Sequence, residues 1–234
     1  MARGENIVRF AQAPPVKAAN AVYLTLAAQV LSLSALVIFE QVRGRSLAAQ
    51  LAAYGGRPQG ADAEAVVGAV TAFAVLMMLA SGGAVAAGAA YVTWLVRARQ
   101  VNDPSAATGP VAVAWLIPGV NLVAPAMLVH EVWQGARPPA GERPRWLALV
   151  SGWWLSWLTA LVLLTIVLPL DSAEGDLTGI GVAQLACVAL AALLCAATVR
   201  KITQVQRSAC AEREAPEPVA ALSPFTPPGL GSAT

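Results

Sequence analysis

The amino-acid sequence predicts an all-α integral membrane protein with four transmembrane helices and one broken segment that is re-entrant or interfacial. Of its 234 residues, 57% are hydrophobic and 12% are charged, whereas a soluble domain usually carries about 25% charge. Four apolar runs approach or exceed the roughly 20 residues that a helix needs to cross a bilayer. A fifth apolar run is interrupted by Pro118, Gly119 and Pro125, which disfavour a continuous helix.

The first predicted crossing is 18–39, after a short cytoplasmic lead, 1–17, that carries three basic residues. A cleaved signal peptide has an apolar region of only about 7–15 residues, so this longer run predicts an uncleaved helix. Residues 40–64 include the sequence Gly55-Gly56-Arg57-Pro58. Because Gly and Pro interrupt regular structure, we expect a short interfacial helix and a loop here.

The second predicted crossing, 65–96, would be about 48 Å long at the α-helical rise of about 1.5 Å per residue. The hydrocarbon core is only about 30 Å thick, so this helix has to tilt, bend or project beyond the bilayer. The sequence Asn102-Asp103-Pro104 follows. It is a typical termination signal, because proline cannot continue a helix.

The broken segment, 111–133, is predicted to be re-entrant rather than to cross the membrane. Only 111–117 precedes the first proline, and seven helical residues span about 10 Å. With four crossings and both termini cytoplasmic, 12 Lys and Arg residues lie inside and 3 outside. A fifth crossing changes these numbers to 10 and 5. The positive-inside rule therefore favours four crossings.

The last two predicted crossings are 146–170 and 179–199, which completes a helical membrane domain over 18–200. The loop between them is acidic, as expected outside the cell. Residues 201–234 are predicted to be a disordered cytoplasmic tail, because their later part is rich in Pro, Ala, Ser and Gly. The expected location is the inner (plasma) membrane, with several passes.

A spaced signature in the middle of the chain is similar to that of a known family. It comprises Tyr91-x-x-Trp94-x-x-Arg97-x-x-x-x-Asn102, then Trp115-x-x-Pro118-x-x-Asn121-x-x-x-Pro125, and finally Glu131-x-Trp133. On these residues the chain resembles the actinobacterial membrane proteins grouped as domain of unknown function 4328, over roughly 18–200. The resemblance implies a helical membrane domain and assigns no activity. His130 and Asp103 depart from the usual pattern.

The sharper functional hypothesis is a polar cluster on the cytoplasmic side, because polar groups inside membranes are costly and often functional. In this hypothesis His130, Glu131 and Arg97 are catalytic, with His130 or Glu131 moving a proton beside the cation. The expected substrate-binding residues are Asn102, Asp103, Asn121, Trp94, Trp115 and Trp133.

A structural alternative explains the same residues without catalysis. Arg97 reaches the interface and pairs with Glu131, and Asn121 binds backbone groups that the two prolines free. Trp94, Trp115 and Trp133 then form an interfacial aromatic belt.

The sequence predicts no metal and no cofactor. The single histidine and the three cysteines lack zinc-ligand spacing, and no hydrolase, protease or phosphate-binding motif is present. A net charge of +2 and the absence of a basic, aromatic patch exclude a nucleic-acid partner.

The first functional hypothesis is a scaffold or partner subunit, in contact with the lipid bilayer and with a membrane protein partner or a homo-oligomer. The alternative is a membrane-embedded enzyme subunit that acts on a peptide or lipid substrate, for example in the maturation of a ribosomally made peptide. A small transporter is the second alternative, although no inverted repeat supports it.

Overall fold

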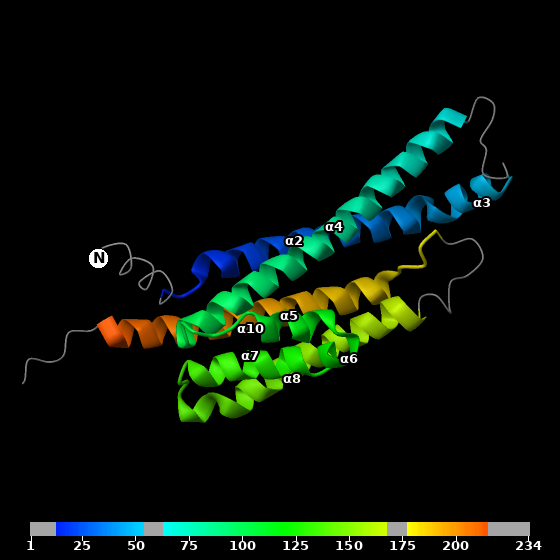
Figure 1. Ribbon diagram of the computed structural model, residues 1–234. Helices are drawn as coiled ribbons and strands as arrows, with labels where there is room; N and C mark the ends of the chain where they lie inside the picture. Colours follow the sequence, from blue (N-terminus) through cyan, green and yellow to red (C-terminus); the bar gives the residue numbers. More distant parts are fainter. Residues whose placement is uncertain (1–12, 54–62, 168–176, 215–234) are drawn as a thin grey trace, which may run out of the picture.

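The computed structural model describes residues 13–53, 63–167 and 177–214, and within these ranges every regular element is a helix (Figure 1). Four stretches are long and apolar enough to cross a membrane: Val16–Ala53, Ala63–Asn102, Arg143–Ile166 and Val182–Glu212. The predicted number of membrane-spanning helices is therefore confirmed. The start of the first stretch and the end of the last lie at the same end of the bundle (Figure 1).

The first helix is longer than predicted. Helix α2 (Val16–Phe39) continues through a π-helical turn, η1 (Glu40–Gly44), into α3 (Arg45–Ala53). The prediction of a separate interfacial helix in this region is wrong up to Ala53, because the Gly-Gly-Arg-Pro sequence comes only at 55–58. The predicted loop lies mostly in 54–62, outside the described residues.

Helix α4 (Ala63–Asn102) packs along α2 and crosses it at an angle (Figure 1). Its 40 residues span about 60 Å. As predicted, the helix ends at the Asn-Asp-Pro sequence. The Asp103 carboxylate accepts hydrogen bonds from Ser105 Oγ at 2.6 Å and from Ser105 N at 2.9 Å. Aspartate side chains favour turns of this kind.

The broken segment forms a hairpin of three short helices: α5 (Gly109–Leu116), α6 (Pro118–Asn121) and α7 (Ala124–Gly135). Ile117 separates the first two with φ −94° and ψ 114°, because a residue before proline is driven out of the helical region. In Figure 1, a loop leads from the end of α4 inward to α5, and α7 returns to the end of the bundle where α4 ends. We call α5–α7 the broken hairpin.

The chain then passes through η2 (Ala140–Glu142) into α8 (Arg143–Val162) and the π-helical turn η3 (Leu163–Val167). The final helix, α10 (Val182–Glu214), is much longer than the predicted 179–199. The prediction of disorder is therefore wrong for 201–214. Residues 215–234 lie outside the described part of the chain.

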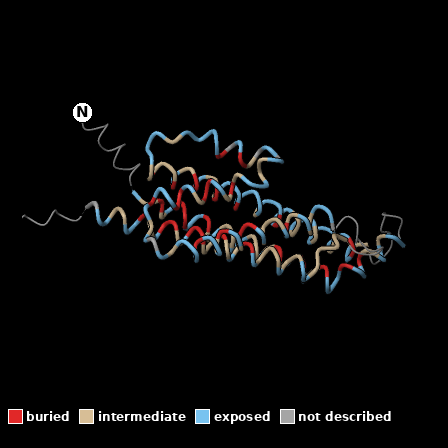
Figure 2. Tube along the Cα trace, turned by 90° about the horizontal axis from the view of Figure 1, so that it is seen from below, coloured by how far each residue is buried: buried red, intermediate tan, exposed pale blue. Residues whose placement is uncertain are grey.

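Buried residues line the inner sides of the helices, and the outer sides are exposed (Figure 2). Many exposed residues are large and apolar: Leu24 is 72% exposed, Met78 75%, Val85 74% and Leu193 69%. A protein surrounded by water rarely exposes so much apolar surface. This outer surface is suited to contact lipid chains.

One buried carboxylate ties the π-helical turn to the start of the last helix. Glu40 is 6% exposed. Its Oε1 accepts hydrogen bonds from the backbone N–H of Leu177 at 2.7 Å and of Thr178 at 3.0 Å, and its Oε2 accepts one from Thr178 Oγ1 at 3.0 Å. These bonds fix the chain just before α10.

We therefore expect Glu40→Ala to lower the free energy of unfolding by about 1–3 kcal/mol, because it leaves three partly buried donors unpaired. Thermal unfolding of the purified protein in detergent measures the loss, and hydrogen exchange should rise at 177–181. Glu64→Ala is the matched control, since Glu64 is exposed at the start of α4. Equal unfolding temperatures for the two variants would contradict the role of Glu40.

Candidate functional site

Asn102 joins the end of α4 to the broken hairpin and to α10. Its Nδ2 donates a hydrogen bond to the backbone carbonyl of Val132 in α7 at 2.7 Å, and its Oδ1 accepts one from Gln206 Nε2 in α10 at 3.2 Å. Gly135, one turn beyond Val132, makes this approach possible. A Cβ atom at Gly135 would lie 2.7 Å from Asn102 Nδ2.

Gln206 makes a second bond at the same place. It is 1% exposed, and its Nε2 also donates to the backbone carbonyl of Ala98 in α4 at 2.7 Å. Gln206 was not among the predicted site residues, because it lies in 201–234, which composition predicts to be a tail. A signal was present: Cys195, Val199, Ile202 and Gln206 are spaced by 4, 3 and 4 residues, as one face of a helix requires.

His130 is held between two partners on α7 and α8. Trp146 Nε1 donates to His130 Nδ1 at 3.0 Å, and the Gln134 side-chain amide lies 3.0 Å from His130 Nε2. An indole N–H can only donate, so Nδ1 carries no proton in this contact. The Trp133 ring stacks on Trp146 with ring centroids 5.1 Å apart and 5° between planes.

The other predicted catalytic residues are not part of this contact. Arg97 and Glu131 are both exposed, and among the described residues no hydrogen bond or ion pair involves either one. The alternative expectation that Arg97 pairs with Glu131 is therefore wrong. Asp103 is also exposed, and its hydrogen bonds with Ser105 hold its pKa below the usual value.

Asn121 lies at the far tip of the broken hairpin, at the end of α6 and away from the end of α4 (Figure 1). Among the described residues, Asn121 Oδ1 is buried without a hydrogen-bond partner. This oxygen therefore does not bind the backbone groups that the prolines free, contrary to the expectation. Trp154 of α8 does so instead, donating from Nε1 to the Leu122 carbonyl at 3.0 Å.

Of the three tryptophans expected in substrate binding, or in an interfacial belt, two are buried and Trp115 is half-buried. Trp94 is 0% and Trp133 3% exposed, which contradicts the belt. Trp94 Nε1 donates to Thr203 Oγ1 of α10 at 3.3 Å. Trp115 is half-buried and packs against Tyr91, with ring centroids 5.5 Å apart.

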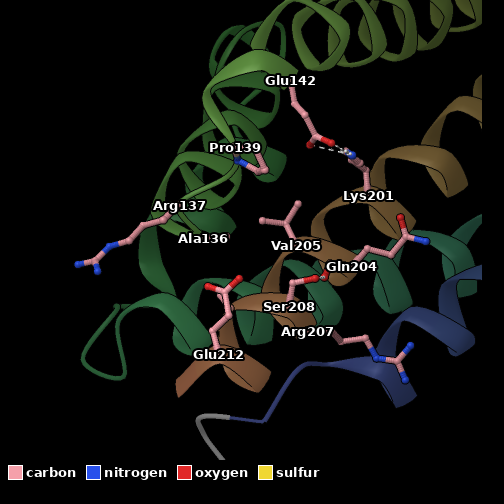
Figure 3. Close-up of a pocket in the computed structure, with 11 residues that line it drawn as sticks. Ala136, Arg137, Pro139, Glu142, Lys201, Gln204, Val205, Arg207, Ser208 and Glu212 are labelled. Atoms are coloured by element: carbon pink, nitrogen blue, oxygen red, sulfur yellow. Dashed lines mark hydrogen bonds and ion pairs between the residues drawn. The ribbon is translucent and has the colours of Figure 1, made fainter. Parts of the chain in front are cut away.

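A groove of about 610 Å³ lies between the turn after α7 and the last turns of α10 (Figure 3). Glu142 and Lys201 form an ion pair beside it, with N–O distances of 2.8 and 2.9 Å. Arg137, which has a φ of 54°, points away from this pair in Figure 3. The side chains are of both signs, so the groove presents no strong field for one kind of charge.

Taken together, the structure places Asn102, His130, Trp94 and Trp133 at helix contacts. It leaves Arg97, Asp103 and Glu131 exposed, and it separates Asn121 from them. General acid–base chemistry needs the base within hydrogen-bond reach of the reacting group, in a shared pocket. The contacts described here hold the broken hairpin against α4, α8 and α10. A catalytic role for His130, Glu131 and Arg97 stays a prediction.

Four apolar helices, with a broken hairpin packed against three of them and buried polar groups that join them, define a multi-pass helical membrane protein. Within that class, the family described as domain of unknown function (DUF4328) matches residues 57–204. The chain belongs to this family, as its central signature indicated. The match covers α4, the broken hairpin and α8, and includes most of α10 up to residue 204.

No curated protein and no solved structure matches the chain. Function therefore has to be inferred from the chain's own residues.

We expect Gly135→Ala to loosen the broken hairpin. The new Cβ would lie 3.3 Å from Asn102 Cβ as well as 2.7 Å from Nδ2, so the bond to the Val132 carbonyl cannot keep its geometry. Loss of this partly buried bond should lower the free energy of unfolding by about 1–3 kcal/mol. Thermal unfolding and limited proteolysis of the purified protein measure the effect.

Gly119→Ala in the same hairpin is the control, because nothing lies within 4 Å of a Cβ built there. If Gly135→Ala unfolds at the same temperature as Gly119→Ala, Asn102 does not anchor the hairpin.

Proposed function

We propose that this protein is a partner subunit of a membrane complex in the plasma membrane and that it binds another membrane protein through a projecting helical arm. The arm consists of η1, α3 and the first turns of α4. The single observation that carries the proposal is the difference in length between the helices of the bundle.

The continuous helix α2–α3 and its neighbour α4 are both much longer than α8–η3. Val16–Ala53 has 38 residues, Ala63–Asn102 has 40 and Arg143–Ile166 has 24. At about 1.5 Å per residue these helices span roughly 57, 60 and 36 Å. In Figure 1 the end of α3 and the start of α4 extend past the ends of α8–η3 and α10.

The arm packs against itself and still has apolar residues exposed. Leu47 and Val66 are each 2% exposed, whereas Val42 is 73% and Val67 is 54% exposed. The helices of the arm extend roughly 20 Å past the end of α8–η3. A bilayer of about 30 Å is already spanned by α8–η3, so this extension lies outside the hydrocarbon core. Exposed apolar residues outside lipid favour contact with another protein.

In this proposal the broken hairpin is re-entrant and both termini are cytoplasmic. The end of the bundle where α4 and α10 end is rich in basic residues, among them Arg97, Arg99, Arg143, Arg145, Arg200 and Lys201. The positive-inside rule assigns such an end to the cytoplasm. Helices α5 and α7 span about 12 and 18 Å, too little to cross the hydrocarbon core.

An enzyme subunit and a small transporter remain alternatives without a specific observation in their favour. The residues predicted to be catalytic are either engaged in helix contacts, as His130 is, or exposed and without a partner in the described part of the chain, as Arg97 and Glu131 are. A peptide or lipid substrate would need these side chains to meet.

Site-specific photo-crosslinking tests the arm in the full chain, in its own membrane. Benzoylphenylalanine in place of Val67 or Val42 should give one discrete cross-linked protein product, identified by mass spectrometry. Benzoylphenylalanine in place of Leu193, which is 69% exposed on the bundle, is the control and should give lipid adducts. The two results should differ because only the arm is expected to contact another protein, whereas Leu193 is expected to face lipid.

A cross-linked product of twice the mass of the chain would replace the heterologous partner with a homo-oligomer. Lipid adducts alone at both arm positions would show that the arm lies in the bilayer and would remove the basis of the proposal.

A further inference from the structure

A cavity of about 510 Å³ lies between the helix pair α2–α4 and the helix pair α8–α10. Most of its wall is apolar and includes Leu33, Leu36, Met77, Leu164 and Val188. The volume falls within the range of about 300–1,000 Å³ that is typical of small-molecule sites. The cavity is separate from the projecting arm and from the groove of Figure 3.

Three buried polar atoms on the residues that line this cavity have no hydrogen-bond partner. They are Gln29 Oε1 of α2, Tyr91 Oη of α4 and Trp115 Nε1 of α5. Tyr91 is 5% exposed. Buried polar groups in proteins are nearly always paired, so these three atoms, from three helices around one cavity, are donors and acceptors that a bound molecule can pair.

The chemistry of these atoms limits what can bind. The indole N–H of Trp115 only donates, the carbonyl oxygen of Gln29 only accepts, and the hydroxyl of Tyr91 does either. A hydroxyl group on the ligand can donate one hydrogen bond and accept another. In the orientation that the structure gives the Gln29 amide, Oε1 accepts, so the ligand has to donate one hydrogen bond as well as accept one.

The ligand has to be uncharged. No Lys, Arg, His, Asp or Glu is among the residues that line the cavity, and an ion buried without a counter-charge is strongly disfavoured. The remaining wall is apolar and suited to a hydrocarbon chain.

The side of α4 gives a route into the cavity from the bilayer. Ser81, Ala84 and Gly88 line the cavity and are also exposed on the outside of α4. Nothing lies within 4 Å of a Cβ atom built at Gly88. Their small side chains leave the wall thin between the cavity and the surface that faces lipid.

We propose that this cavity binds one molecule of a neutral, single-chain lipid whose head is a hydroxyl group, with the head at Gln29, Tyr91 and Trp115. The hydrocarbon chain lies along the apolar wall between α2 and α10. This site is independent of the partner role proposed for the arm.

The test uses the purified full-length protein in nanodiscs and a hexadecanol probe that carries a photoreactive diazirine in its chain. Adducts are mapped by mass spectrometry. We expect them at cavity residues such as Leu36 and Met77, and unlabelled hexadecanol should compete. Hexadecane lacks the head and palmitate carries a charge, so each should compete about tenfold less well, the ratio that corresponds to about 1.4 kcal/mol.

Two variants test the geometry. Tyr91→Phe keeps the ring and removes the hydroxyl, so hexadecanol should bind about fivefold to tenfold more weakly, as the loss of one hydrogen bond predicts. Gly88→Trp should block labelling of the cavity. Gly82→Trp is its matched control, because Gly82 is also exposed on α4 with open space at its Cβ and does not line the cavity.

Several results would overturn the proposal. Adducts spread over the outer apolar residues would show ordinary lipid contact. Equal competition by hexadecane would remove the role of the polar atoms, and equal competition by palmitate would remove the requirement for a neutral head. An absence of adducts in the cavity would show that it holds only water. If Gly88→Trp fails to fold, Tyr91→Phe and the three competitors still decide the question.

Discussion

Backbone groups that lipid cannot hydrate have to be paired inside the protein, and the irregular parts of this fold are arranged around that constraint. The broken hairpin frees the Leu122 carbonyl, which Trp154 pairs. At the hairpin's return, Asn102 binds the carbonyl of Val132. The chain before α10 exposes the N–H of Leu177, which Glu40 accepts. Trp154 and Glu40 supply bonds that the irregular backbone lacks, whereas Asn102 adds a second bond to the Val132 carbonyl, which also accepts the Ala136 N–H. Each irregular segment is therefore also a point of attachment between helices.

This constraint changes how polar residues in apolar sequence should be interpreted. Asn102 and His130 stand out in the sequence because they are costly in a membrane, and that cost is compatible with catalysis or with structure. The structure gives both residues partners at 2.7–3.2 Å, which accounts for their cost through helix contacts. Arg97 and Glu131 differ, because exposed charges at a helix end can be hydrated and carry no comparable cost.

The parts of the fold that could be predicted from sequence are those set by local composition. Apolar length identified the four spanning helices, and Pro104 marked the end of α4. The last part of α10, after residue 200, could not be predicted in this way, because its polar residues resemble a tail by composition. Only the spacing of Val199, Ile202 and Gln206 indicates its buried face. The bond from Gln206 to the Ala98 carbonyl joins residues 108 positions apart, and no local pattern specifies such a pairing.

Aromatic residues pack both arms of the broken hairpin, α5 and α7, against neighbouring helices. At its return, α7 brings Trp133 against Trp146 with the rings stacked at 5.1 Å, so contact between α7 and α8 is close there. Near its break, the end of α5 brings Trp115 against Tyr91 and Trp157 with edge-on rings at 5.5 and 6.0 Å, and a cavity lies beside them. The extended backbone of Ile117, imposed by the proline that follows, ends α5 just after Trp115. The break at Ile117 therefore places Trp115 at the wall of the cavity, while the return of the chain through α7 packs Trp133 against α8.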